Sequence, residues 1–284
     1  PSESTLAICD NCQSEIDERE PAMDVMSSED RRTLARISRS GRSLIDRRAV
    51  TNMSTLLKQL RIERCSLELP STPSTVLEPH QLYNQARESV VVVAGLYLCG
   101  RCDKWHASTA TGFVISTSGA IVTNYHVVNS NKKETLVVMT SDGHVQPVQR
   151  VLAADQRDDL AILQVDADNL TPLPIATSQE AAPVGSSIYV ISHPANHFYS
   201  LTAGVVSRYI SHHTAQGDAA CIDITADYAR GSSGAPVLNV QGQVVGIVRS
   251  TESIYYAKKD GQPSNLQMVF KHCIPAECLR QLIH

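Results

Sequence analysis

A serine between glycines lies at the centre of the most informative segment of the sequence. The segment Gly231-Ser232-Ser233-Gly234-Ala235-Pro236 follows a polar loop and precedes an apolar, strand-like run. Because glycine lets the backbone come close to a ligand, the N–H groups of Gly231 and Ser233 can converge beside the Ser233 hydroxyl and form an oxyanion hole. Ordinary surface turns have the same composition, so this segment indicates catalysis only if partner residues occur elsewhere in the chain.

A serine hydroxyl is a weak nucleophile that needs a general base and a third group to hold the base in the right tautomer. His126 follows the apolar strand-like run 120–122 almost directly, which would fix its imidazole on a rigid edge. Asp159 immediately precedes another strand-like run, 160–163, so its carboxylate would lie at the start of that strand. His126 and Asp159 are therefore the candidates for base and orienting acid, although each alone would pass for a structural residue.

Two Cys-x-x-Cys pairs, Cys9 with Cys12 and Cys99 with Cys102, occur among the eight cysteines. The tight turn of the second pair can direct two thiolates at one zinc ion. His106 could add a third ligand, or the first pair could complete a four-thiolate site. The even count fits two small disulfide loops equally well, so zinc, disulfides and free thiols all stay open.

The elements that would position these residues are short strands. After the first 79 residues the chain consists of short runs rich in Val and Ile, bounded by Gly, Pro, Asn and Asp, which predicts a β-barrel or sandwich. Only residues 275–283 return to a helical pattern. No internal repeat and no glycine-rich phosphate loop is evident.

The N-terminal part of the chain has a different texture. Residues 28–66 are rich in Arg, Leu and Ile and predict two or three helices, with Gly41 separating the first two and Ser54 capping the next. Acidic residues among the arginines favour a solvated helix face over a basic docking face. Residues 70–79 are rich in Pro, Ser and Thr and predict a linker. We therefore expect a helical N-terminal segment with a Cys-x-x-Cys (1–69), the linker (70–79) and a main domain (80–284).

Composition excludes several classes of protein. The chain has 284 residues, of which 42% are apolar, so it can bury a real core in one or two domains. Its formal charge of −4 lacks the basic excess of a nucleic-acid binder, so we expect no nucleic-acid partner. The longest apolar runs fall far short of the roughly 20 residues that cross a bilayer, which predicts no membrane span.

Three blocks of the sequence resemble the chymotrypsin-fold serine peptidases, in particular the bacterial HtrA proteases. They are residues 111–128 with Thr123-Asn124-Tyr125-His126, residues 159–163, and residues 231–247 with the serine segment. The order His, Asp, Ser is that of the family. The resemblance covers roughly residues 79–284 and implies a mainly β fold, a chymotrypsin-like double β-barrel with a short C-terminal helix, here preceded by a small helical segment.

The resemblance implies roles for the three candidate residues. Ser233 would be the nucleophile, His126 the general base and then acid, and Asp159 the group that orients the imidazole. The protein would be a serine endopeptidase that hydrolyses protein or peptide substrates through an acyl-enzyme. This catalysis requires no cofactor, so any zinc at the cysteines would be structural. The alternative is a catalytically silent protein that keeps the fold for binding or as a scaffold.

The resemblance also implies a substrate pocket. Val248, Arg249 and Ser250 correspond to the strand that pairs with an extended substrate. Asp227 corresponds to the floor of the primary pocket of trypsins, where a buried carboxylate would favour Lys or Arg before the scissile bond. Ser232 replaces the aspartate that binds the new N-terminus in digestive trypsins, so we expect control by loop ordering instead of that salt bridge.

Three expectations concern the whole protein. Only a short helix fits after Pro275, so we expect no PDZ domain of the kind many HtrA proteases carry. Assembly into a homo-oligomer is expected from the resemblance. A periplasmic or secreted location is favoured by it too, although a sequence pI of about 6.2 also suits the cytosol.

Overall fold

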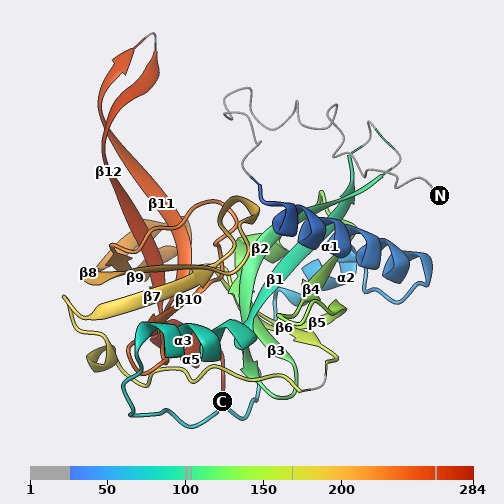
Figure 1. Ribbon diagram of the computed structural model, residues 1–284, viewed down its shortest axis with the longest axis horizontal. Helices are drawn as coiled ribbons and strands as arrows, with labels where there is room; N and C mark the ends of the chain where they lie inside the picture. The colour runs from blue at the N-terminus through green and yellow to red at the C-terminus, as the bar shows by residue number, and fades with distance from the viewer. Residues whose placement is uncertain (1–25, 100–101, 103, 168, 260) are drawn as a thin grey trace.

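Two closed, six-stranded antiparallel β-barrels form most of the molecule (Figure 1). The computed structural model describes residues 26–99, 102, 104–167, 169–259 and 261–284. The first barrel has the strand order β1-β2-β3-β6-β5-β4, with strands Val90–Leu98 (β1), Trp105–Ser116 (β2), Ala120–Asn124 (β3), Thr135–Met139 (β4), Val145–Asp155 (β5) and Leu160–Val165 (β6). The second has the order β10-β11-β12-β9-β8-β7, with strands Ser187–Ser192 (β7), Ser200–Thr214 (β8), Gly217–Ile224 (β9), Pro236–Asn239 (β10), Val244–Lys259 (β11) and Gln262–Pro275 (β12). The predicted mainly β, double-barrel fold is confirmed.

Helices cover the barrels and join them. The α-helices are Ser28–Asp46 (α1), Met53–Gln59 (α2), Pro79–Ala86 (α3), Tyr125–Val128 (α4) and Ala276–Gln281 (α5), and the short 3₁₀ helices are Arg87–Ser89 (η2), Gln179–Ala181 (η3) and Pro194–Asn196 (η4). Helix α5 is the short helix expected in residues 275–283. No helix in the described part of the chain is both long enough and apolar enough to cross a membrane.

Strand β1 begins with consecutive apolar residues because both of its faces are buried. Val91 and Val93 point into the first barrel, where they pack with Leu136 and other strand residues. Val92 and Ala94 lie on the outer face and pack against α1. A strand covered on both faces needs apolar residues at every position, so helix α1 accounts for half of the pattern.

Helix α1 passes through Gly41 without interruption, so the expectation that this glycine separates two helices is wrong. Gly41 is buried, and a Cβ at this position would overlap the side chain of Leu96 on β1. The glycine therefore allows close contact between helix and barrel, and the cost of a mid-helix glycine, roughly 1 kcal/mol, is offset by that packing.

The expected cap of the next helix is also wrong by two residues. The side chain of Asn52, not that of Ser54, accepts a hydrogen bond from Thr55 N (2.9 Å) and caps α2. The Ser54 hydroxyl donates to the same Asn52 oxygen (2.9 Å). Both side chains suit a helix start, and sequence alone does not separate positions two residues apart.

Buried side chains join the two barrels to each other and to the helices that precede them in the chain. Phe113 and Ile162 of the first barrel pack in one buried cluster with Leu238 and Ile247 of the second. Residues 26–69 also share the barrel cores, because Leu56 of α2 lies inside the first barrel cluster. The division into segment, linker and protease domain stays a proposal.

Candidate active site

His126 lies on the short helix α4, directly after strand β3. The junction of β3 and α4 is held by the carbonyl oxygen of Asp159, which accepts hydrogen bonds from the backbone N–H of Tyr125 (3.0 Å) and the side-chain amide of Asn124 (3.1 Å). The His126 imidazole is about half exposed, with 51% of its side-chain surface accessible to solvent. It can therefore meet a substrate while its backbone is held against the start of β6.

Asp159 holds His126 through both carboxylate oxygens. Oδ2 lies 2.8 Å from His126 Nδ1, and Oδ1 accepts the His126 backbone N–H at 2.9 Å. The residue is buried and has a φ of 57°, a left-handed conformation that is uncommon outside glycine. A carboxylate on Nδ1 favours the tautomer whose Nε2 is free to accept a proton, which is the requirement for a general base.

Ser233 lies in a turn that is docked on the first barrel. Its carbonyl oxygen accepts a hydrogen bond from Thr111 N (3.0 Å), and Gly234 N donates to Val248 O (3.0 Å). Gly234 has a φ of 85°, and a Cβ there would overlap Thr111 O and Thr123 of strands β2 and β3. The turn is thus held next to the end of β3, the strand that leads to His126.

The backbone before Ser233 is oriented by the loop after β7. Ala195 N donates to Arg230 O at 2.7 Å. In a trans peptide the C=O and the following N–H point in opposite directions, so the Gly231 N–H points away from this loop. Within the described residues the N–H groups of Gly231 and Ser233 have no protein acceptor. The oxyanion hole expected at these two N–H groups stays a prediction.

Buried polar groups support this loop and turn. The hydroxyls of Ser232 and Ser192 lie 2.9 Å apart, and both are buried. His193 Nδ1 accepts a hydrogen bond from Tyr199 N (3.0 Å), and burial lowers the pKa of His193 to about 4. A Cβ on Gly231, which has a φ of 97°, would overlap the His193 carbonyl oxygen. Close backbone contact therefore requires glycine at position 231.

The predicted pocket residues have mixed placements. The Asp227 carboxylate is 87% exposed and lies 2.7 Å from Lys271 Nζ, so it is not the buried carboxylate expected at a pocket floor. Val248 is buried, and its N–H and C=O are already bonded, to Ala235 and Gly234. Ser250 O accepts a hydrogen bond from Tyr228 Oη (3.0 Å). Of these four residues, the structure thus places Arg249 beside Asp159.

Arg249 is a site residue whose position the sequence did not reveal. Its Nε lies 3.7 Å from Asp159 Oδ2, on the carboxylate that binds His126. The β11–β12 ladder skips Arg249 at a bulge between Val248 and Ser250, which turns the side chain toward the first barrel. A bulge has no dependable signal in a single sequence.

Asp30 is a second contact that sequence reasoning missed. It lies at the start of α1, more than 160 residues away in sequence from the loop after β7, and its Oδ1 accepts a hydrogen bond from Phe198 N (3.1 Å). That loop contains the non-glycine residues Ala195, Asn196 and Tyr199 at positive φ. A strained backbone persists only where its surroundings hold it, and Asp30 is one such restraint.

The described cysteine pair and its histidine lie together. Cys99 Sγ is 3.4 Å from Cys102 Sγ, which is 3.1 Å from His106 Nε2. One potential ligand atom of each lies within 4.8 Å of the other two, and the expected metal site stays a prediction. Cys9 and Cys12 lie outside the described residues.

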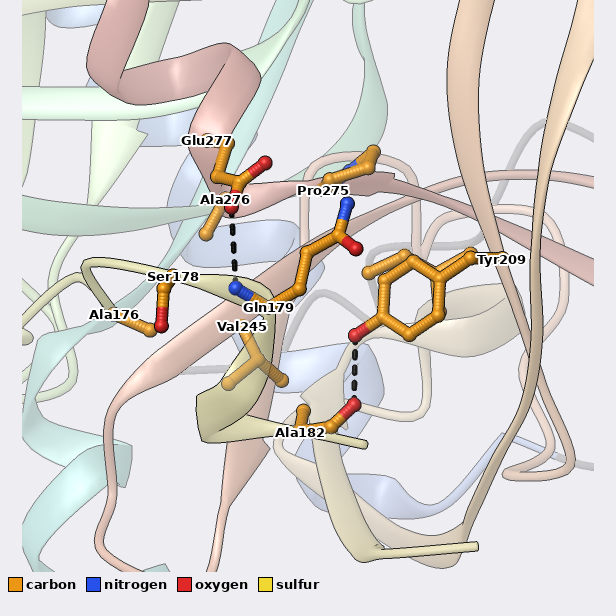
Figure 2. A pocket seen from close by; sticks show the side chains of 10 residues that line it. Ala176, Ser178, Gln179, Ala182, Tyr209, Val245, Pro275, Ala276 and Glu277 are labelled. Atoms are coloured by element: carbon orange, nitrogen blue, oxygen red, sulfur yellow. Dashed lines mark hydrogen bonds between the residues drawn. The ribbon is translucent and has the colours of Figure 1, made fainter. Parts of the chain in front are cut away.

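A small cavity on the second barrel is unrelated to this chemistry (Figure 2). It is lined by Gln179, Tyr209 and Glu277 among others, and Gln179 N donates to Glu277 Oε1 at 3.1 Å. Its volume of about 10 Å³ has room for one water at most. We therefore assign it no role in substrate binding.

Residues 110–247 match the family model of the trypsin-like peptidase domain. This match covers just under half of the chain, and together with the double barrel it makes the chain similar to the trypsin-like serine peptidases. The chain also resembles DegP/HtrA-type serine endoproteases.

A probable periplasmic serine endoprotease DegP-like of Halomonas elongata is 36% identical over 142 residues, which cover 49% of this chain and 29% of that protein. The chloroplastic protease Do-like 1 of Arabidopsis thaliana is 31% identical over 205 residues, or 66% of this chain and 45% of that protein. The chain thus spans less than half of these relatives' lengths.

Solved structures show the same fold. The serine endoprotease from Yersinia pestis has a TM-score of 0.54 at 23% identity and covers 75% of this chain and 66% of its own. The HtrA-type protease AlgW with tripeptide has a TM-score of 0.54 at 20% identity, with 70% of this chain and 60% of that chain covered. At such identities the likeness concerns the fold alone.

Proposed function

We propose that the chain is a serine endopeptidase in which Ser233, His126 and Asp159 form the catalytic triad. One observation carries the proposal: Asp159 binds both the Nδ1 and the backbone N–H of His126, at 2.8 and 2.9 Å. A purely structural pair would not need a half-exposed imidazole. The docked serine turn, with its two unbonded N–H groups, supports the same reading.

The proposed reaction is acyl transfer to water. Ser233 Oγ attacks the substrate carbonyl while His126 Nε2 accepts the hydroxyl proton, and Asp159 stabilises the resulting imidazolium. The N–H groups of Gly231 and Ser233 bind the developing oxyanion. His126 then donates the proton to the leaving amine, and a water molecule that His126 deprotonates releases the acyl group.

We propose that the substrate is a protein or peptide that adds to the edge of β11. Because Val248 already uses its backbone groups and Ser250 O accepts the Tyr228 hydroxyl, the pairing would centre on Arg249. Strand β10 pairs with β11 at Val244, Gly246 and Ile247, so a substrate strand could add to the same edge of β11 beyond Val248.

The preference for Lys or Arg before the scissile bond stays a prediction. Its support is the position of Asp227 six residues before Ser233, and the Asp227–Lys271 ion pair weighs against it. Cleavage of a peptide library by the parent and by Asp227→Asn tests it. Loss of basic-residue cleavage in the variant would support the preference, and an unchanged profile would contradict it.

Covalent labelling with a fluorophosphonate probe, read by intact mass, tests the triad. We expect one label on Ser233 of the parent and none on Ser233→Ala or His126→Ala. His144→Ala, an exposed histidine on the first barrel, is the matched control and should label like the parent. An unlabelled parent that is otherwise folded would favour the alternative of a silent binding or scaffold protein.

A structural zinc ion at Cys99, Cys102 and His106 is a further proposal, with Cys9 and Cys12 as candidate remaining ligands. The two described cysteines and the histidine lie within 4.8 Å of one another, as ligands of one ion would. Metal analysis should find less zinc in Cys102→Ser than in the parent. Equal zinc in both proteins would contradict the site.

Two broader proposals concern the setting of the enzyme. A periplasmic or secreted location is supported by the names of the bacterial relatives, which are probable periplasmic endoproteases, and is tested by cell fractionation. A homo-oligomer is supported by exposed apolar side chains on the β11–β12 hairpin, Tyr256, Leu266 and Met268. Light scattering should give a mass above that of one chain, and should fall to that mass when these three residues are made polar.

A further inference from the structure

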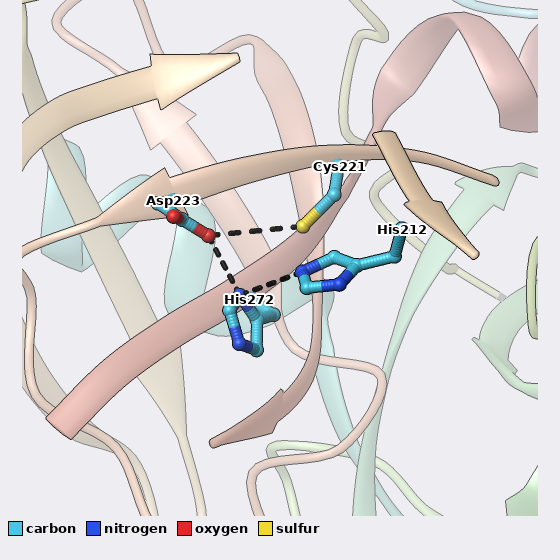
Figure 3. A group of neighbouring side chains, drawn as sticks. All are labelled: His212, Cys221, Asp223 and His272. Atoms are coloured by element: carbon cyan, nitrogen blue, oxygen red, sulfur yellow. Dashed lines mark hydrogen bonds and ion pairs between the residues drawn. The ribbon is translucent and has the colours of Figure 1, made fainter. Parts of the chain in front are cut away.

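Four side chains of the second barrel converge at a place that the proposed catalysis does not use (Figure 3). They are His212 of β8, Cys221 and Asp223 of β9, and His272 of β12. One potential ligand atom from each residue lies within 4.8 Å of all the others. The cluster combines two imidazoles, a thiol and a carboxylate.

The strand register brings these residues to one face of the sheet. Asp223 lies opposite His272 in the β9–β12 ladder. Cys221, two residues before Asp223, shares its face and lies opposite Ile210 of β8. His212, two residues after Ile210, is on that face too. Three adjacent strands therefore deliver the four side chains without any loop.

The separations suit a small tetrahedral site. His212 Nε2 lies 3.3 Å from His272 Nδ1, and Cys221 Sγ lies 3.8 Å from an Asp223 oxygen. Ligands about 2.0 to 2.3 Å from a zinc ion are separated by roughly 3.3 to 3.8 Å in a tetrahedron. The 2.6 Å contact between His272 Nδ1 and Asp223 Oδ1 is a hydrogen bond that an ion would replace.

Two charged side chains outside the cluster bind two of the four residues. Glu252 Oε2 lies 3.4 Å from His272 Nε2, the ring nitrogen that faces away from the cluster. Arg208 Nε donates to Asp223 Oδ2 at 2.5 Å and leaves Oδ1 for the cluster. A carboxylate behind a histidine ligand and a donor behind a carboxylate ligand are the usual outer partners of a metal site.

We infer that His212, Cys221, Asp223 and His272 bind one zinc ion. Imidazole nitrogen and thiolate sulfur favour zinc over magnesium and calcium, which take oxygen ligands. Cys221, Asp223 and His272 are buried, whereas His212 is half-buried and borders an open cavity of about 300 Å³ that gives an ion access.

The ion would join β8, β9 and β12, and β12 pairs with β11, the strand proposed to bind substrate. His272 lies opposite Ser250 in the β11–β12 ladder, and Arg249 and Ser250 border the same cavity. This structural role rests on the proposed function, whereas zinc binding itself does not. The test therefore measures metal, not proteolysis.

Zinc and cobalt titrations of the full chain carrying Ser233→Ala, which prevents self-cleavage, test the inference. We expect His212→Ala to bind one equivalent of zinc fewer than this parent. Cys221→Ser should bind zinc at least tenfold more weakly and lose part of the thiolate-to-cobalt charge-transfer absorption. The controls are His213→Ala, whose ring faces Asp218, and Cys102→Ser, which reports separately on the first-barrel cysteines.

The outcome depends on His212 because this half-buried side chain can be truncated without emptying the core. Far-UV circular dichroism confirms the fold of each variant. If His212→Ala binds as many equivalents as His213→Ala, with the same affinity, the inference is wrong. Loss of one equivalent in His212→Ala but not in His213→Ala supports it, also in the Cys102→Ser background.

Discussion

Asp159 fixes the geometry of the proposed triad, because its two oxygens hold the ring and the backbone of His126. We expect Asp159→Asn to lower kcat by about 10⁴-fold, since the amide would present an N–H to Nδ1 and favour the wrong tautomer. The measurement is kcat on a peptide substrate. Asp166→Asn, an exposed change on the same barrel, should leave kcat unaltered, and an active Asp159→Asn would refute the assignment.

His193 predicts a loss of stability in acid. Burial lowers its pKa to about 4, below the ordinary value of 6.5. As the pH falls below 6.5 the unfolded chain takes up a proton that the folded chain does not, so stability is greatest above pH 6.5 and declines toward pH 4. The decline from this group is at most about 3 kcal/mol.

Urea unfolding at pH 7.5 and at pH 4.5 checks this dependence. His193→Asn should flatten it, because an asparagine oxygen can still accept the Tyr199 N–H but does not titrate in this range. His80→Asn, which removes an exposed imidazole, is the control and should follow the parent. Identical pH dependence in the parent and His193→Asn would show that another group is responsible.

The sequence alone was enough to propose those candidate residues that are marked by their neighbours in the chain. Ser233 is recognisable by its flanking glycines, and His126 and Asp159 by their places beside apolar strands. The contact of Arg249 with Asp159 and that of Asp30 with Phe198 were missed, because the partners lie about 90 and 170 residues apart in the chain. Asp227 was expected to be buried, yet the partner that keeps it at the surface, Lys271, is 44 residues further on.

At the scale of elements, α1 restrains the loop that orients the oxyanion turn. Asp30 accepts the Phe198 N–H, and Ala195 of the same loop binds Arg230 O. We expect Asp30→Ala to lower kcat about tenfold with little change in KM, because one lost charged hydrogen bond of about 1.5 kcal/mol would favour a disordered loop.

Steady-state kinetics and the rate of fluorophosphonate labelling measure this effect. Glu29→Ala, an exposed change one residue earlier, should behave like the parent. Circular dichroism should show that Asp30→Ala is folded. If its kcat equals that of Glu29→Ala, helix α1 does not control the loop.

The elements themselves were predictable to different degrees. The strands were recognisable from their Val and Ile runs, and the C-terminal helix from its pattern. The predicted boundaries of α1 and α2 were wrong at Gly41 and Ser54. Gly41 lies inside α1, where it packs closely against Leu96, and the side chain of Asn52 caps α2. Local propensity gives the type of an element more reliably than its ends.

At the scale of the whole molecule, the helices before the barrels are part of their core. Ile37 of α1 is fully buried against Val92, Leu96 and Val137. We expect Ile37→Ala to lower the free energy of unfolding by about 2 to 5 kcal/mol, because the cavity cannot close between a helix and a sheet. Urea unfolding measures it, with exposed Arg39→Ala as the control.

The same packing bears on truncation. A protein lacking residues 1–69 would expose the outer face of β1 and lose Leu56 from the first barrel. We therefore expect it to aggregate or unfold at lower temperature. A stable, more active truncated protein would show instead that these helices restrict access to the proposed active site.

The two barrels also become complete at different moments as the ribosome delivers the chain. The barrel that carries His126 and Asp159 has all its strands once Val165 has emerged. The second barrel, which carries Ser233, cannot close until β12, residues 262–275, inserts between β9 and β11. Domains tend to fold in the order of synthesis. We therefore expect the barrel with His126 and Asp159 to fold before the barrel with Ser233. A nascent chain that ends between Ser233 and β12 would contain all three proposed triad residues and still be unable to cleave its own unfolded part.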